Sequence, residues 1–132
     1  MSDDFEQQSW VKFGVASALA KQYAADQRGF LVMLSHMLAS ALPDATETVR
    51  RGGLFAKKTI QRIVITIGEN RYTLEDSGRG PLTASRTHIV RGIALKTEEI
   101  SVELWVEELG AQLDERARTS LSAREALSKL VG

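Results

Sequence analysis

The sequence predicts an α+β domain: an antiparallel meander of three or four strands, with two N-terminal and two C-terminal helices packed mainly on one face. Two observations predict this class. Residues 57–75 alternate apolar and polar side chains with the period of a strand. The segments on either side repeat apolar residues at spacings of three and four, which is the period of a helix. Because 132 residues suit one domain and no linker interrupts them, we expect a single domain over residues 1–132.

The stretch 57–75 predicts a β-hairpin with one apolar and one polar face. Its two strands meet at Gly68-Glu69-Asn70, a short connection in which glycine can supply a positive φ. An isolated hairpin is marginally stable in water, so its apolar face requires a cover. The residues expected on that face are Ile63, Ile65, Ile67, Tyr72 and Leu74.

Four helices are expected around this hairpin. The first runs over residues 5–26 and ends near Gly29, and the second runs over 30–42 and ends before Pro43. The third begins after the capping residue Ser101, and the last begins near Ser122. The second helix is apolar nearly all round, so its surplus surface predicts burial on two sides and a homodimer interface. Its one histidine, His36, is expected in the core or in that interface.

The remaining segments are less regular. Residues 43–56 are expected to form a loop with a hinge at Gly52-Gly53, and residues 76–81 to form a turn. A third strand is expected over 82–91. Gly92 then marks a bulge or bend, after which Ile93–Lys96 continue the extended chain or form a fourth strand.

The net charge of zero hides an uneven distribution. Residues 50–96 hold ten basic and three acidic side chains, net +7, whereas residues 1–49 hold three basic and six acidic, net −3. Residues 97–132 hold four basic and eight acidic, net −4. Either acidic helices neutralise a basic sheet within the molecule, or the basic middle faces an anionic partner.

Two groups of residues are candidates for that binding surface. The first is a loop in which two basic pairs flank two apolar residues. The second is a set of strand arginines that could align across the polar face of the sheet. The alternative for both groups is a solvated surface without a ligand. The candidate residues are Arg50, Arg51, Leu54, Phe55, Lys57 and Lys58 in the loop, and Arg62, Arg71, Arg86 and Arg91 in the strands.

Catalytic chemistry has little support in the sequence. The chain has no cysteine and two histidines, and it lacks H-E-x-x-H, so we expect no metal site. Neither a phosphate-binding glycine motif nor a G-x-S-x-G elbow occurs, so we expect no cofactor and no enzymatic activity. The N-terminal residues lack the pattern of a signal peptide, and the longest apolar run is too short to cross a bilayer. Together these features predict a cytoplasmic protein.

We therefore interpret the sequence as a small non-catalytic interaction domain of the adaptor or chaperone-like kind, which meets an acidic protein partner through the basic loop and the basic sheet face. The alternative is a polyanion binder that uses residues 50–62 and the sheet arginines, with nucleic acid or an anionic membrane surface as its ligand. The two hypotheses differ in salt dependence, because displacement of counterions makes polyanion binding fall steeply as salt rises.

Overall fold

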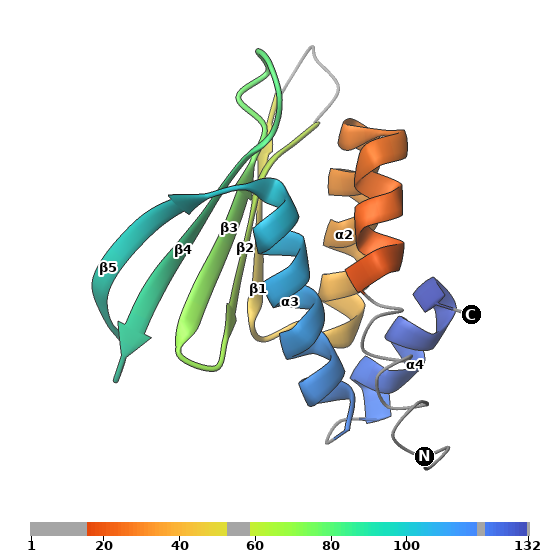
Figure 1. Ribbon diagram of the computed structural model, residues 1–132, viewed down its shortest axis with the longest axis vertical. Helices are drawn as coiled ribbons and strands as arrows, with labels where there is room; N and C mark the ends of the chain where they lie inside the picture. Colours follow the sequence, from red (N-terminus) through yellow and green to blue (C-terminus); the bar gives the residue numbers. More distant parts are fainter. Residues whose placement is uncertain (1–15, 53–58, 119–120, 132) are drawn as a thin grey trace, which may run out of the picture.

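The computed structural model describes residues 16–52, 59–118 and 121–131. Within these ranges five antiparallel strands form one sheet in the order of the chain, and the helices lie together on one side of it (Figure 1). The α+β prediction is confirmed, with five strands in place of three or four. The strands are β1 (Thr46–Arg51), β2 (Thr59–Ile67), β3 (Asn70–Glu75), β4 (Thr83–Val90) and β5 (Ile93–Ile100).

The β2–β3 hairpin lies at the centre of the sheet, as the alternation predicts. Ile67 pairs with Asn70 across the turn, and Gly68 takes a φ of 64°. The five predicted apolar residues are all buried against the helices. Tyr72 also meets Trp105 of the helix layer edge to face, with ring centroids 6.3 Å apart. The helix-facing side of the hairpin is therefore the sheet's share of the hydrophobic core.

The helix layer consists of residues 16–25, α2 (Gln27–Ala41), α3 (Val102–Ala117) and α4 (Leu121–Val131). Ser101 caps α3 as predicted, since its hydroxyl accepts a hydrogen bond from the Leu104 amide. Close packing in this layer requires Gly110, because a Cβ at that position would lie 3.0 Å from the Cα of Ala16. The layer buries the apolar stripes of α2 and α3 against the sheet.

The first two helices are divided at a different residue than the sequence suggests. Asp26 is extended, with φ −161°, and its carbonyl accepts the first hydrogen bond of α2 from the Phe30 amide. Gly29 lies inside α2. Asp26 makes no side-chain capping hydrogen bond, so the boundary rests on its extended backbone, and glycine is tolerated inside α2 because it costs only about 1 kcal/mol within a helix.

Residues 43–56 were predicted to be irregular, and for residues 46–51 that prediction is wrong. Thr46–Arg51 form the edge strand β1, paired with β2 from Thr46↔Ile65 to Arg51↔Thr59. The Thr46 hydroxyl donates to the Leu42 carbonyl over 2.8 Å, which joins the end of α2 to the strand. A threonine-rich hexapeptide suits an edge strand even when its alternation is weak.

Helix α2 is buried on one side only, contrary to the expectation from its composition. His36 is exposed, so it does not lie in the core, and its alternative place in a homodimer interface stays a prediction. Val32 is the one large apolar side chain of α2 that the structure shows as exposed. The other large apolar residues of this helix are buried or partly buried, so one covered side accounts for most of its apolar composition.

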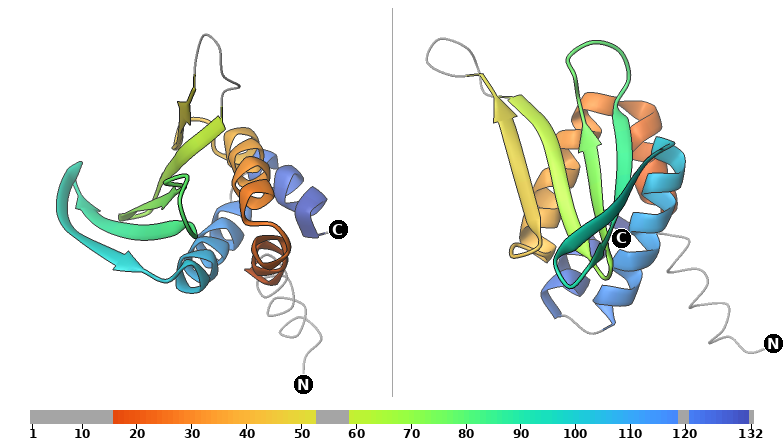
Figure 2. Two further views of the ribbon diagram at one scale, coloured as in Figure 1. Left: turned by 90° about the horizontal axis from the view of Figure 1, so that it is seen from above. Right: turned by 90° about the vertical axis from the view of Figure 1, so that its left-hand side faces the viewer.

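The fifth strand changes the interpretation of Gly92. Arg91 and Gly92 have φ of 52° and 80°, so they form the two-residue turn of a β4–β5 hairpin in place of a bulge. The bulge lies farther on, at Leu95, because Ile89 pairs with Ala94 and His88 pairs with Lys96. The β4–β5 hairpin curves away from the helices and crosses in front of the sheet's open face (Figure 2).

Candidate functional site

The sheet arginines do not share one face. Across β2 and β3 Arg62 pairs with Glu75 and Thr66 with Arg71, which places Arg62 and Arg71 on the face away from the helices. Arg86 pairs with Tyr72, a core residue, and therefore lies on the helix side. The prediction of one basic sheet face fails here, because Arg86 has the opposite orientation to Arg62 and Arg71.

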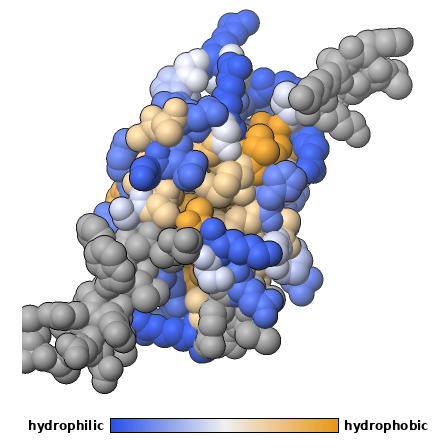
Figure 3. Space-filling view, turned by 90° about the vertical axis from the view of Figure 1, so that its right-hand side faces the viewer, coloured by the Kyte–Doolittle hydropathy of each residue, from blue (hydrophilic) through white to orange (hydrophobic). Residues whose placement is uncertain are grey.

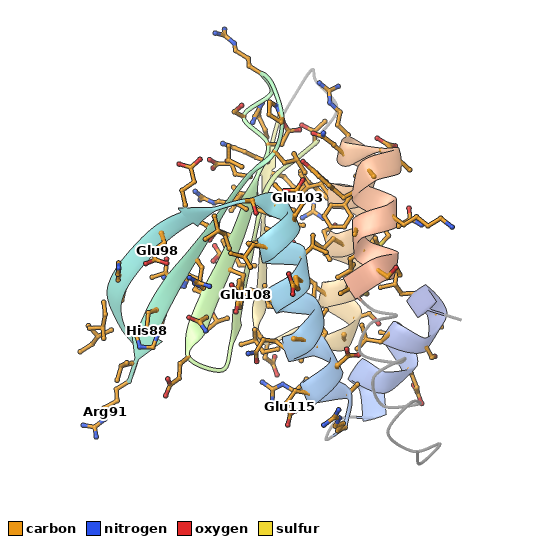
Figure 4. The ribbon with its side chains drawn as sticks, viewed as in Figure 1. His88, Arg91, Glu98, Glu103, Glu108 and Glu115 are labelled. Carbon is orange, nitrogen blue, oxygen red and sulfur yellow. The ribbon has the colours of Figure 1, made fainter. Side chains whose placement is uncertain are left out.

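Arg86 instead joins the sheet to α3 within a cluster of charged side chains. Two of its members, Glu98 of β5 and Glu108 of α3, are labelled in Figure 4. Its guanidinium donates to Glu98 of β5 over 2.8 Å and to Glu108 of α3. The Tyr72 hydroxyl donates to the second oxygen of Glu108 over 3.2 Å. Lys96 lies 2.8 Å from the other oxygen of Glu98. This charged cluster therefore holds together β3, β4, β5 and α3.

The charged cluster shifts the pKa of three of its members, Tyr72, Arg86 and Glu98. Burial and the neighbouring Glu108 raise the pKa of Tyr72 to about 12, so the phenol keeps its proton at neutral pH. Hydrogen bonds from Lys96 and Arg86 lower the pKa of Glu98. Hydrogen bonds to Glu108 and Glu98 raise the pKa of Arg86. Two cations face two carboxylates, so the charged cluster is neutral and its guanidinium has both partners it needs.

These groups favour a structural role for the charged cluster over a chemical one. A guanidinium bound by two carboxylates has little attraction for a further anion, and a phenol with a raised pKa is a poor general base. In the described part of the chain, no group of three or more histidine, aspartate or glutamate side chains could hold a metal ion. Internal neutralisation is one of the two explanations that the sequence allows for the uneven charge distribution. For Arg86 that explanation holds, because acidic residues of β5 and α3 neutralise it within the molecule.

The basic loop is described only at its start. Arg50 and Arg51 are exposed at the end of β1, and Arg51 donates to the carbonyl oxygens of Asp76 and Ser77 in the β3–β4 loop. Arg51 therefore ties two loops together at one end of the sheet. Leu54, Phe55, Lys57 and Lys58 lie outside the described residues, so their part in the predicted binding surface stays a prediction.

The other three strand arginines lie in separate places on the sheet. Arg62 pairs with Glu75 over 3.6 Å, and Arg91 occupies the exposed tip of the β4–β5 hairpin (Figure 4). Arg71 borders an open depression of about 400 Å³ on the outer face, whose other charged residues are Asp44 and Glu47. Each of these arginines has a different setting, so the described residues form no continuous cationic patch.

A different surface is more distinctive, at the end of the sheet that the helices leave uncovered. Val90, Ile93 and Leu95 are 36, 64 and 60% exposed, and they are three of the five large exposed apolar side chains among the described residues. β5 pairs with β4 alone, so its other edge has no strand beside it in the described chain. We call these three residues and the free edge of β5 the hairpin surface. Exposed apolar groups beside an open strand edge are typical of protein contact sites.

The helix side of the molecule has fewer exposed large apolar side chains than the hairpin surface. Apolar residues reach the surface in the middle of that face and hydrophilic residues surround them (Figure 3). Among the described residues of α2, only Val32 contributes a large exposed apolar side chain there. None of the helices in the described ranges combines the length and the apolar character that crossing a bilayer would need.

The hairpin surface was missed by the sequence analysis, although a signal for it exists. The pattern is a two-residue turn, Arg91-Gly92, with one β-branched residue on each side, Val90 before it and Ile93 after it. A β-branched residue on each side of a pair that can adopt positive φ is typical of a tight hairpin. The partners of Arg86 had no such signal, because Glu108 is 22 residues away in the chain. Only the packing of α3 on the sheet brings them together.

The chain matches no protein-family model, no curated protein and no solved structure. The fold and these surfaces are therefore interpreted from the structure alone.

Proposed function

We propose that this protein is a non-catalytic interaction domain whose contact site is the hairpin surface. The observation that carries the proposal is the concentration of exposed apolar side chains at Val90, Ile93 and Leu95 beside an unpaired strand edge. Folded domains commonly shield such edges with charge, proline or a covering element. β5 carries such charges in its second half, at Lys96, Glu98 and Glu99, whereas its first half, from Ile93 to Leu95, is apolar and exposed, which suits that half to receive an extended segment of another protein chain.

The binding mode is strand addition. An incoming segment would satisfy the free backbone groups of β5 and cover the apolar side chains of the hairpin. This places the contact away from the basic loop and makes its strength depend on apolar burial and backbone hydrogen bonds. Binding of this kind persists at moderate salt, whereas the alternative polyanion site would lose affinity steeply.

The test compares two variants in a nuclease-treated native lysate at low and moderate salt. The hairpin variant carries Ile93→Ser and Leu95→Ser, and the loop variant carries Arg50, Arg51, Lys57 and Lys58 all changed to alanine. A stoichiometric protein that the wild type and the loop variant retain at both salts, and the hairpin variant loses, is the expected result. Hydrogen exchange on the recovered complex then slows in Ile93–Ile100.

Two outcomes would contradict the proposal. If the loop variant loses the partner and the hairpin variant keeps it, the site lies on the basic loop. If nucleic acid or anionic lipid is recovered at low salt only, and the loop variant abolishes it, the polyanion alternative is correct. In either case the exchange rates in β5 would be the same with and without the partner.

A further inference from the structure

The free edge of β5 carries a charge pattern that matches its own antiparallel copy. Lys96 and Glu98 are two residues apart and lie on the same face, because their side chains meet over 2.8 Å. A strand that pairs with β5 therefore meets one cation and one anion in a fixed order. The antiparallel partner with the best charge match carries an anion opposite Lys96 and a cation opposite Glu98, which is the order that β5 itself presents when reversed.

From this we infer that β5 pairs antiparallel with β5 of a second copy of this chain, about a two-fold axis at Thr97, to form one continuous sheet of ten strands. The inference rests on the proposed function, since it names the chain that occupies the hairpin surface. In the pair Lys96 lies opposite Glu98 of the second copy, and Glu98 lies opposite Lys96. Each cation then has a carboxylate beside it on its own strand and another across the new interface.

The register follows from geometry. In a continuous antiparallel sheet, directly opposite residues point to the same face. The two-fold axis must therefore set one residue of β5 directly opposite the same residue of the second copy, and we name the axis by that residue. An axis at Lys96, Glu98 or Glu99 would place like charges opposite each other, which is destabilising. An axis at Leu95 would place the bulge at the centre of the pairing. An axis at Ile100, the last residue of β5, would place the first residues of α3 opposite the strand, so Thr97 is the remaining position within the regular part of β5.

The same axis accounts for the exposed apolar residues. Because the bulge at Leu95 sets two residues of the strand against one, antiparallel pairing about Thr97 places Ile93 opposite Ile100 of the second copy, one residue before Ser101, after which that copy's α3 begins. Leu104, in the first turn of α3, is 39% exposed. The hairpin tip of each copy therefore comes beside the first turn of the other's α3, where Ile93 and Leu104 can cover each other. Four of the five exposed large apolar residues lie in or beside this one contact.

A single introduced cysteine tests the register, because the chain has none of its own. In a pair centred on Thr97 the two copies of residue 97 are directly opposite, with Cα atoms about 5 Å apart, within the range of a disulfide. Glu99→Cys is the matched control on the same strand. Its two copies are four residues apart along the strand, about 13 Å, which no disulfide can bridge.

Under mild oxidation Thr97→Cys should give a disulfide-linked dimer on a non-reducing gel, while Glu99→Cys stays monomeric. Sedimentation equilibrium of the wild type should show a dimer that Lys96→Glu weakens at least tenfold. Arg79→Glu makes the same charge change in the β3–β4 loop and should leave the dimer unchanged.

A wild-type monomer at every concentration, or equal cross-linking at positions 97 and 99, would overturn the second-copy inference. The proposed function would survive that result if the hairpin variant still lost a different partner, so the two failures can be told apart. A dimer that both Lys96→Glu and Arg79→Glu leave intact would place the self-contact elsewhere.

Discussion

The molecule contains two hairpins with nearly the same local design and opposite surroundings. In β2–β3 the turn at Gly68-Glu69 joins strands whose apolar face lies under the helices. In β4–β5 the turn at Arg91-Gly92 joins strands whose tip extends beyond the helices, where Ile93 is 64% exposed. The difference lies in the helix layer, which covers the first hairpin and leaves the tip of the second exposed, so the turn alone does not decide whether a hairpin is buried.

The charged cluster marks the boundary between these two regions. On one side of Arg86 lies Tyr72 of the buried hairpin, and on the other lies Glu98 of the exposed one. Because Glu108 of α3 binds Arg86, which also binds Glu98 of β5, this guanidinium joins the helix layer to β5, in addition to the packing of Ile100 against the core. The four tests below ask whether burial in one hairpin and anchoring of the other are separate properties.

The sharpest test of the comparison is the same substitution in each hairpin. Ile65→Ala removes a fully buried side chain and should lower the free energy of unfolding by about 2–5 kcal/mol. Ile93→Ala should change it by less than about 0.5 kcal/mol, since that side chain is mostly in solvent. Urea unfolding of dilute protein measures both. Equal losses would show that the hairpin surface is covered in the isolated chain.

A second test removes the anchor of the exposed hairpin. Arg86→Met should cost about 1–2 kcal/mol, because Glu98 and Glu108 both lose a charged hydrogen-bond partner at a partly exposed site. Arg62→Met is the control, since its ion pair with Glu75 is longer and more exposed. Hydrogen exchange should accelerate in β5 for the first variant only. Unchanged exchange in β5 would mean that α3 does not anchor the hairpin.

The third test measures how stability depends on pH through Tyr72, the buried member of the charged cluster. The folded protein raises the pKa of Tyr72 from 10.0 to about 12, so its contribution to stability is complete below pH 10 and is lost as pH rises towards 12. Tyr72→Phe should cost about 1 kcal/mol at neutral pH through the lost hydrogen bond to Glu108. Between pH 10 and 12 the variant should lose less stability than the wild type. Parallel pH profiles would contradict the assignment.

The smallest effect is expected at the exposed turn. Arg91 has a φ of 52°, a conformation that costs most residues about 1–2 kcal/mol but that asparagine tolerates better. Arg91→Asn should therefore stabilise the protein by about 0.5 kcal/mol in thermal unfolding. A β-branched residue there, in Arg91→Val, should do the opposite. If both variants melt alike, the turn contributes nothing to the hairpin's stability.

What the sequence predicts well is the part of the sheet that the helices bury. Alternation marks a strand when one of its faces is in the core, and Ile63, Ile65 and Ile67 satisfy that condition. β5 has no fully buried residue, so its sequence lacks the periodic signal and only its first four residues were predicted as extended chain. The same argument explains β1, which lies at the opposite edge and is also largely unburied.

The candidate site was harder to predict, for a reason of orientation. Parity along β4 groups Arg86 with His88, but parity alone does not say which group faces the helices. A charged side chain was assigned to solvent, whereas Arg86 lies on the helix side because α3 supplies Glu108 there. A tertiary contact between residues far apart in sequence decides the face, and no local pattern contains it.

The order of the strands has a kinetic consequence. Every strand pairs only with its neighbours in the chain, so each step of the meander closes a short loop and no step waits for a distant segment. The sheet can form by adding one strand at a time, and it can open in the same way. Since β5 is the last strand, it can detach while β1–β4 keep all their mutual pairings. Amide exchange should therefore be fastest in β5 and slowest in β2 and β3, and occupation of the β5 edge would remove that gradient.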